Sequence, residues 1–219
     1  MLLGLASGAV LITFMITTSF QLSHWSNSIK LFNHAIKATK RNADMYYNLG
    51  LEYQKGGLYK KAIQLYQRVI DIYPKYMRAY TNLGLTYQKK GELDKSIETY
   101  KKAIEIKPDY AKAYLNLGLA YRRQGKFVEA IETYQKVINI KPDYAKAYNN
   151  LGVAYQMKGD IQAAIGMYQK AIDQDPEYLK AYNNLLTVLR LQGRHKEAND
   201  ILQKALQLKR TTIPSMASD

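Results

Sequence analysis

The stretch from Asn82 to Gly118 begins and ends on the same three residues: NLGLTYQKKGELDKSIETYKKAIEIKPDYAKAYLNLG. This recurrence is not confined to one stretch, because glycine and proline recur every 34 residues along the chain. The positions are Gly50, Gly84, Gly118 and Gly152, and Pro74, Pro108, Pro142 and Pro176. A fixed period of this length is typical of a repeat array, in which each unit is one supersecondary element. The sequence therefore predicts a series of near-identical units.

Each unit predicts two helices. With the first unit numbered from Ala43, the first helix has Tyr46, Leu49, Gly50 and Tyr53 at positions 4, 7, 8 and 11. The second helix has Ala62, Tyr66 and Val69 at positions 20, 24 and 27. Both spacings place one apolar stripe on a helix. Glycines such as Gly57 are expected at the turn between the helices, and proline at position 32 is expected to end the second helix.

This pattern resembles the tetratricopeptide repeat, W-x2-L-G-x2-Y, then A-x3-F, then P, with Tyr in place of Trp and Phe. The resemblance implies an all-α solenoid of helical hairpins, wound as a right-handed superhelix with a concave groove. We expect five repeats, at 43–76, 77–110, 111–144, 145–178 and 179–212. The last repeat departs from the pattern at Leu186, Leu189 and Arg210, as a terminal repeat does, and residues 213–219 are expected to be disordered.

The first 23 residues carry no charged side chain. As a helix they are long enough to cross a bilayer, so the sequence predicts a transmembrane helix over 1–23 and a single-pass membrane protein. Lys30, Lys37, Lys40 and Arg41 follow this segment, and the positive-inside rule then places the repeats in the cytoplasm. Residues 24–42 predict a half-repeat helix that joins the membrane to the array.

Asparagine occupies position 6 of every unit, off the apolar stripe. These residues, Asn48, Asn82, Asn116, Asn150 and Asn184, are called the amide row below. An amide both donates and accepts hydrogen bonds, so a row of amides can pair with the backbone of an extended peptide. The row resembles the asparagine ladder in the peptide groove of O-linked N-acetylglucosamine transferases. The alternatives are that each asparagine bonds within its own repeat, or that it only reflects duplication of the unit.

Basic residues flank the amide row at positions 2, 12 and 13. Nine of these fifteen positions are Lys or Arg: Arg78, Lys112, Lys146, Lys180, Lys55, Lys89, Arg122, Arg123 and Arg190. The whole chain has 32 Lys and Arg against 18 Asp and Glu, which favours anionic partners. We predict a peptide-binding site formed by the amide row with Arg78, Lys112, Lys146, Lys180, Lys89, Arg122 and Arg123, for an extended acidic segment. The alternative is an ordinary solvated basic surface.

Several classes of site are not expected. The chain has no cysteine and three scattered histidines, so the sequence predicts no metal, no cofactor and no catalytic residues, and hence no enzyme. Nucleic acid is not an expected partner, because most tyrosines occupy core positions of the repeats and are not free to stack on bases. The two-carboxylate clamp of chaperone-binding repeats is not expected either, because position 9 is never Asn and position 5 is never Lys.

Two function hypotheses follow. The first is a membrane-anchored scaffold that binds an acidic segment of a partner protein or associates with its own copies. The second uses residues 21–39, QLSHWSNSIKLFNHAIKAT, which resemble the junction between the last transmembrane helix and the repeat tail of membrane-embedded, mannosyltransferase-like glycosyltransferases. That resemblance implies a non-catalytic, substrate-presenting part of such an enzyme, with the repeats outside the cytoplasm. On repeat architecture alone, the chain is also similar to organelle-scaffolding proteins such as those that coat magnetosomes.

Overall fold

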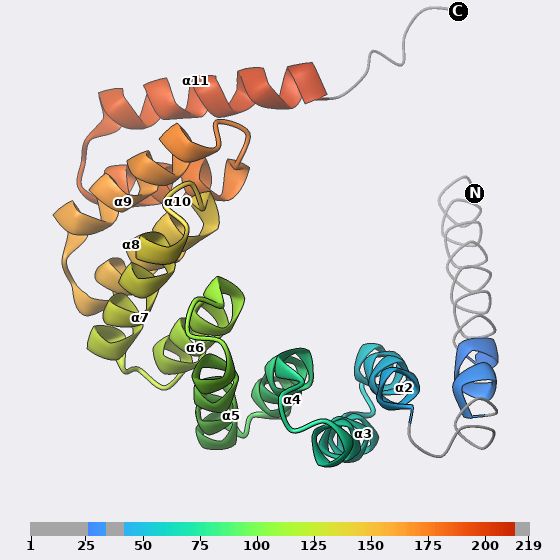
Figure 1. Cartoon of the computed structure of the whole chain (residues 1–219). Coiled ribbons are helices and arrows are strands. Elements are labelled where there is room, and N and C mark those ends of the chain that lie inside the picture. The colour runs from blue at the N-terminus through green and yellow to red at the C-terminus, as the bar shows by residue number, and fades with distance from the viewer. Residues whose placement is uncertain (1–25, 34–41, 213–219) are drawn as a thin grey trace, which may run out of the picture. The chain divides into compact units, whose positions relative to one another are not determined.

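The computed structural model describes residues 26–33 and 42–212, and these residues form helices and turns with no strand (Figure 1). A short helix covers residues 26–33. The helices after it are α2 (Ala43–Lys55), α3 (Tyr59–Ile72), α4 (Met77–Lys90), α5 (Leu93–Ile106), α6 (Ala111–Arg123), α7 (Phe127–Ile140), α8 (Ala145–Lys158), α9 (Ile161–Gln174), α10 (Leu179–Leu191) and α11 (His195–Thr212). The predicted all-α fold of helical hairpins is confirmed.

The chain divides into two compact units, Met1–Thr99 and Tyr100–Asp219, and each is described by itself. In the first unit, α2 packs on α3, and α4 packs on α3 and also contacts α2. The core of this unit is a buried cluster of Ala62, Tyr66, Val69, Ile70, Ala79 and Leu83. The two α4 residues in that list show that the second hairpin closes the core of the first.

The second unit stacks three hairpins in the same way. Helices α6 and α7, α8 and α9, and α10 and α11 form pairs, while α6 contacts α8 and α8 contacts α10. Ala147 and Leu151 of α8 complete the core begun by Tyr134 and Val137 of α7. Each hairpin therefore covers the apolar face that its predecessor leaves exposed, as expected for a repeat array.

A glycine of the first helix meets a tyrosine of the second in the hairpins. A Cβ added to Gly118 would lie 2.6 Å from Cε1 of Tyr134, and the same contact would be 2.8 Å between Gly50 and Tyr66. Gly152 and Tyr168 repeat it at 2.6 Å. All three tyrosines are fully buried. The two helices therefore cross at a separation that leaves no room for any side chain at position 8.

The turns follow from glycine and proline, as the sequence predicts. Gly91 and Gly159 end α4 and α8 in the left-handed region, with φ of +88° and +94°, which other residues rarely adopt. At the end of α9, Asp175 has an extended backbone, with φ −145° and ψ 92°. The following Pro176 imposes this conformation, because its ring disfavours helical geometry in the residue before it.

The predicted membrane localisation requires a correction. Within residues 26–33 and 42–212, no helix is long and apolar enough to cross a bilayer. The physical reason is that these helices are amphipathic, and each carries charged residues on the face away from the core. Residues 1–23, to which the predicted span refers, and residues 213–219, the predicted tail, lie outside the described residues. So does most of the junction that resembles glycosyltransferases, and that resemblance stays a prediction.

The contact between Gly118 and Tyr134 gives a matched pair of substitutions. We expect Gly118→Leu to lower the free energy of unfolding by about 3 kcal/mol, because the side chain must enter the space that Tyr134 fills. Gly166 is also helical, on α9, but a Cβ added there meets nothing within 4 Å. Gly166→Leu should therefore stabilise the chain slightly through its better helix propensity. Urea unfolding followed by circular dichroism measures the free energy of unfolding of both variants. Equal changes in the two variants would contradict the contact between Gly118 and Tyr134.

The buried tyrosine hydroxyls give a second matched pair of substitutions. The hydroxyl of Tyr168 donates a hydrogen bond of 2.6 Å to Oε1 of Gln156, whereas that of Tyr66 is buried without a partner among the described residues. Tyr168→Phe should cost about 1 kcal/mol of stability, because the hydrogen bond is lost. Tyr66→Phe should be neutral or stabilising, because it removes an unpaired polar group. Thermal unfolding measures both variants. If Tyr66→Phe lost more stability than Tyr168→Phe, the hydroxyl of Tyr66 would have a partner.

Candidate functional site

The amide row lies on the first helices of the hairpins. Asn48 and Asn82 belong to α2 and α4 in the first unit, and Asn116, Asn150 and Asn184 to α6, α8 and α10 in the second. All five side chains are half-buried. Because the first helices of successive hairpins contact each other within each unit, position 6 of one hairpin lies beside the preceding hairpin.

Two members of the row bond to the preceding hairpin. Nδ2 of Asn82 donates to the hydroxyl of Tyr47 at 2.6 Å, and Nδ2 of Asn184 donates to Oδ1 of Asn149 at 2.8 Å. Neither bond is to the residue's own repeat, which is the alternative that the sequence left open. Each of these two amides keeps one N–H group and its carbonyl oxygen available. In the part of the chain that the structure describes, the side-chain amides of Asn48, Asn116 and Asn150 have no partner.

The acceptors of these two bonds were not recognised in the sequence. Tyr47 and Asn149 occupy position 5, and the asparagine that each one bonds lies 35 residues further along the chain. Leu115 occupies the same position before Asn150 and has no polar side-chain atom. The sequence holds a partial signal, because Tyr47 and Asn149 have polar side chains that reach the asparagine of the next hairpin.

Position 12 also links hairpins. Nε2 of Gln54, which is buried, donates to the backbone oxygen of Asn82 at 3.1 Å and to Oγ1 of Thr86 at 2.7 Å. Gln156 instead accepts from Tyr168, on the second helix of its own hairpin. Glutamine at position 12 is thus a structural residue in both cases: Gln54 holds the backbone beside the amide row, and Gln156 holds the buried tyrosine of its own hairpin.

The predicted basic residues beside the amide row are mostly exposed. Arg78, Lys112, Lys146, Lys180, Lys89 and Arg123 are exposed, and Arg122 is half-buried. None of these seven cations forms an ion pair with a carboxylate of the described residues. Lys55, by contrast, lies 2.8 Å from Glu52. The seven residues are called the basic flank below, and their charges remain available to a ligand.

Asp44 is the one acidic residue among positions 2, 12 and 13, and it is already engaged. It accepts a hydrogen bond of 2.8 Å from the hydroxyl of Tyr76. Burial and this hydrogen bond to Asp44 raise the pKa of Tyr76 to about 12. Asp44 keeps its negative charge, but it forms no ion pair with a residue of the basic flank among the described residues.

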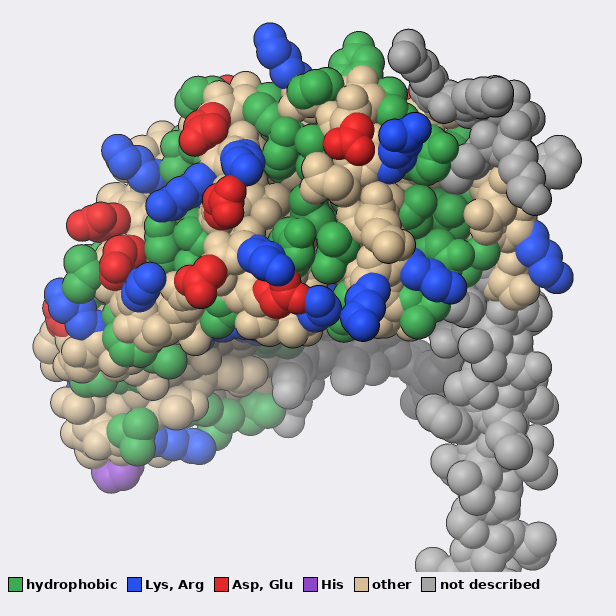
Figure 2. Space-filling model, turned by 90° about the horizontal axis from the view of Figure 1, so that it is seen from below, with side chains coloured by type: hydrophobic (Ala, Val, Ile, Leu, Met, Phe, Trp, Pro, Cys, Tyr) green, Lys and Arg blue, Asp and Glu red, His purple; other side chains and the backbone are tan. Residues whose placement is uncertain are grey.

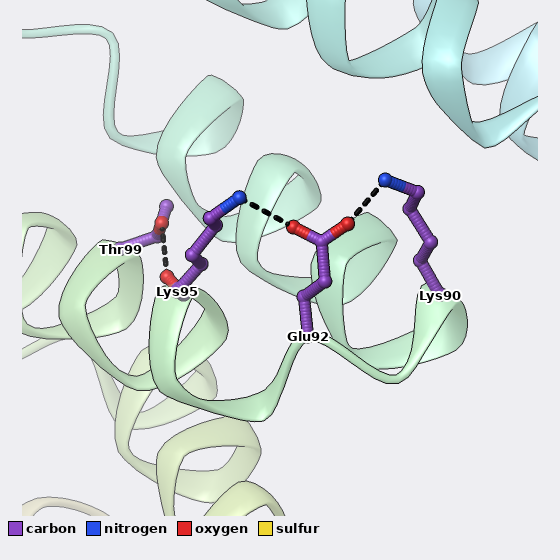
Figure 3. A network of polar contacts seen from close by, with 4 residues as sticks. All are labelled: Lys90, Glu92, Lys95 and Thr99. Atoms are coloured by element: carbon purple, nitrogen blue, oxygen red, sulfur yellow. Dashed lines mark hydrogen bonds and ion pairs between the residues drawn. The ribbon is translucent and has the colours of Figure 1, made fainter.

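Some charged residues elsewhere form ion pairs. Glu92, in the turn between α4 and α5, pairs with Lys90 and, at 2.8 Å, with Lys95 (Figure 3). Hydrogen bonds from the two lysines lower the pKa of the Glu92 carboxyl. Figure 2 shows a face of the molecule on which acidic and basic side chains are interspersed in this manner. What distinguishes the basic flank is therefore its position beside the amide row and not the lack of ion pairs.

Family models match most of the chain. A model described as "TPR repeat" matches residues 51–91, 89–125 and 118–159, and two described as "Tetratricopeptide repeat" match 145–178 and 179–213. No curated protein matches the chain significantly.

Solved structures of repeat proteins are similar to the chain. A crystal structure of MamA is 29% identical, with a TM-score of 0.67, over 74% of this chain and 95% of that one. MamA from Desulfovibrio magneticus RS-1 is 22% identical, with a TM-score of 0.68, over 78% and 97%. YrrB, described as a TPR protein with an unusual peptide-binding site, is 18% identical, with a TM-score of 0.61, over 83% and 93%. At identities this low, the last two likenesses concern the fold alone.

Proposed function

The chain belongs to the tetratricopeptide repeat family, and from that premise we propose that the amide row and the basic flank bind an extended, acidic segment of a partner protein. Arrays of this class are protein-interaction scaffolds that present extended binding surfaces and are typically not catalytic. The observation that carries the proposal is the coincidence of unpaired amides with unpaired cations on the same helices. In the second unit these are Asn116 with Lys112 and Arg123 on α6, and Asn150 with Lys146 on α8.

The amides supply recognition of the peptide backbone. Each of Asn116 and Asn150 offers two N–H donors and a carbonyl acceptor, and an extended peptide presents a donor and an acceptor at every residue. Such pairing is independent of the peptide's side chains, so it provides affinity without selecting a sequence. Asn48, Asn82 and Asn184 have the same chemistry, reduced by one donor at Asn82 and Asn184.

The basic flank supplies the preference for acidic peptides. An exposed cation contributes little to affinity by itself, typically below about 1 kcal/mol per pair. Within the second unit, several unpaired cations beside the amide row act together, and they favour acidic ligands and accelerate encounter with them. This contribution falls as salt rises, because the Debye length shortens. We therefore expect binding of the acidic segment to weaken strongly with ionic strength.

The amide row is tested by a double substitution. We expect Asn116→Ala with Asn150→Ala to weaken binding of a ten-residue peptide of alternating Gly and Glu, blocked at both ends, by about tenfold, because at least two hydrogen bonds are lost. Isothermal titration calorimetry measures the affinity.

The matched control is Asn139→Ala with Asn199→Ala, two exposed residues on the second helices α7 and α11. The control should bind as the wild type does, and both double variants should keep the wild-type melting temperature. Unchanged binding by the Asn116 and Asn150 variant would rule out the amide row as the peptide site.

A further inference from the structure

Arg122 differs from the rest of the basic flank. It occupies position 12 at the end of α6, where the neighbouring units have glutamine, Gln88 and Gln156. Its Nε atom is buried and has no hydrogen-bond partner among the described residues. Nη1 lies 3.5 Å from Sδ of Met157, a weak acceptor on α8. Arg122 is therefore a partly desolvated cation with no counterion in the part of the chain that the structure describes.

The surroundings of Arg122 are apolar and phenolic. Burial raises the pKa of Tyr134 to about 12, and the charge of Arg122 and a side-chain hydrogen bond from Arg122 act in the opposite direction. Burial also raises the pKa of Tyr168 to about 12, again opposed by Arg122. These tyrosines belong to α7 and α9, so the guanidinium lies close to two successive hairpins. The hydroxyl of Tyr134 is buried beside this guanidinium.

This arrangement is costly in the free chain. A cation that is partly removed from water loses solvation, and the neutral groups beside Arg122, Tyr134 and Met157, replace that solvation only in part. Packing does not require the charge, because Gln156 occupies the same position one hairpin later and forms a hydrogen bond with its tyrosine. A local feature that lowers stability without a structural benefit is expected mainly at functional sites.

We infer that Arg122 selects a carboxylate of the bound peptide, an inference that rests on the proposed function of this surface. Because Nε is buried, the carboxylate meets the Nη end of the guanidinium, beside Met157, whose side chain is 48% exposed. A planar guanidinium holds a carboxylate through charge-assisted hydrogen bonds with a defined direction. The exposed lysines of the basic flank are hydrated point charges and give attraction without such geometry. Arg122 thus supplies the specificity that the amide row lacks.

The carboxylate can belong to a Glu or Asp side chain or to the end of the partner chain, and three peptides distinguish these sources. The first is the blocked peptide of alternating Gly and Glu. The second is its blocked counterpart with Gln for Glu, and the third is the Gln peptide with a free carboxyl terminus. Tighter binding of the first than of the second indicates a side-chain carboxylate, and tighter binding of the third than of the second indicates a terminal one.

The test is Arg122→Gln in the full chain, which installs the residue found at the same position in the neighbouring repeats. Arg190→Gln is the matched control, because Arg190 occupies position 12 of the last unit and is exposed. We expect the wild type to prefer a carboxylate peptide over the blocked Gln peptide. Arg122→Gln should weaken binding of the carboxylate peptide by about tenfold, because one charge-assisted contact is lost. Its affinity for the blocked Gln peptide should stay within about twofold of the wild-type value. Arg190→Gln should weaken binding of the carboxylate peptide by less than about threefold.

Failures of the inference and of the proposed function are distinguishable. If the wild type binds none of the three peptides, the proposed function is wrong and the inference falls with it. If the wild type binds them but Arg122→Gln and Arg190→Gln have equal effects, the selective role of Arg122 is wrong while the peptide-binding surface stands. Circular dichroism and the melting temperature show that Arg122→Gln is folded, since glutamine is native to this position.

Discussion

In three hairpins, α2–α3, α6–α7 and α8–α9, the contact between a glycine of the first helix and a buried tyrosine of the second is the constraint on which the rest of the hairpin depends. Gly118 against Tyr134 and Gly152 against Tyr168 fix how closely the helices approach and how the first helix is rotated about its axis. Once position 8 faces the second helix, position 6 must lie on another face, because successive residues are about 100° apart around a helix. The orientation of the amide row therefore follows from a packing contact made by other residues.

The candidate surface is not uniform along the array. Asn82 and Asn184 each use one donor to bond the preceding hairpin, and Gln54 is committed to the backbone and Thr86. The side-chain amides of Asn116 and Asn150 form no such bond, and Arg122 has no counterion among the described residues. These three residues lie on α6 and α8, two helices in contact within the second unit. In the function that we propose, backbone recognition and carboxylate selection would therefore be concentrated at these two neighbouring hairpins.

The sequence predicted the helical hairpins because their signals are local: apolar stripes, glycine at turns and proline after the second helix. It did not predict the bonds of Asn82 and Asn184, because each depends on a residue 35 positions away whose side chain must have a polar atom within reach. Nor did it predict that Arg122 is half-buried while the rest of the basic flank is exposed. Burial at position 12 differs between units, from buried Gln54 to exposed Arg190. The membrane localisation rested on residues 1–23 alone, and among the described residues no helix supports it.

The most direct test of this account is a titration of the ¹⁵N-labelled chain with the blocked peptide of alternating Gly and Glu, followed through the side-chain amide resonances of asparagine by NMR. The account predicts that the resonances of Asn116 and Asn150 shift with the same binding constant, while those of Asn139 and Asn199, on the second helices α7 and α11, do not move. Shifts confined to Asn139 and Asn199, or spread equally over all four, would contradict peptide binding along the amide row.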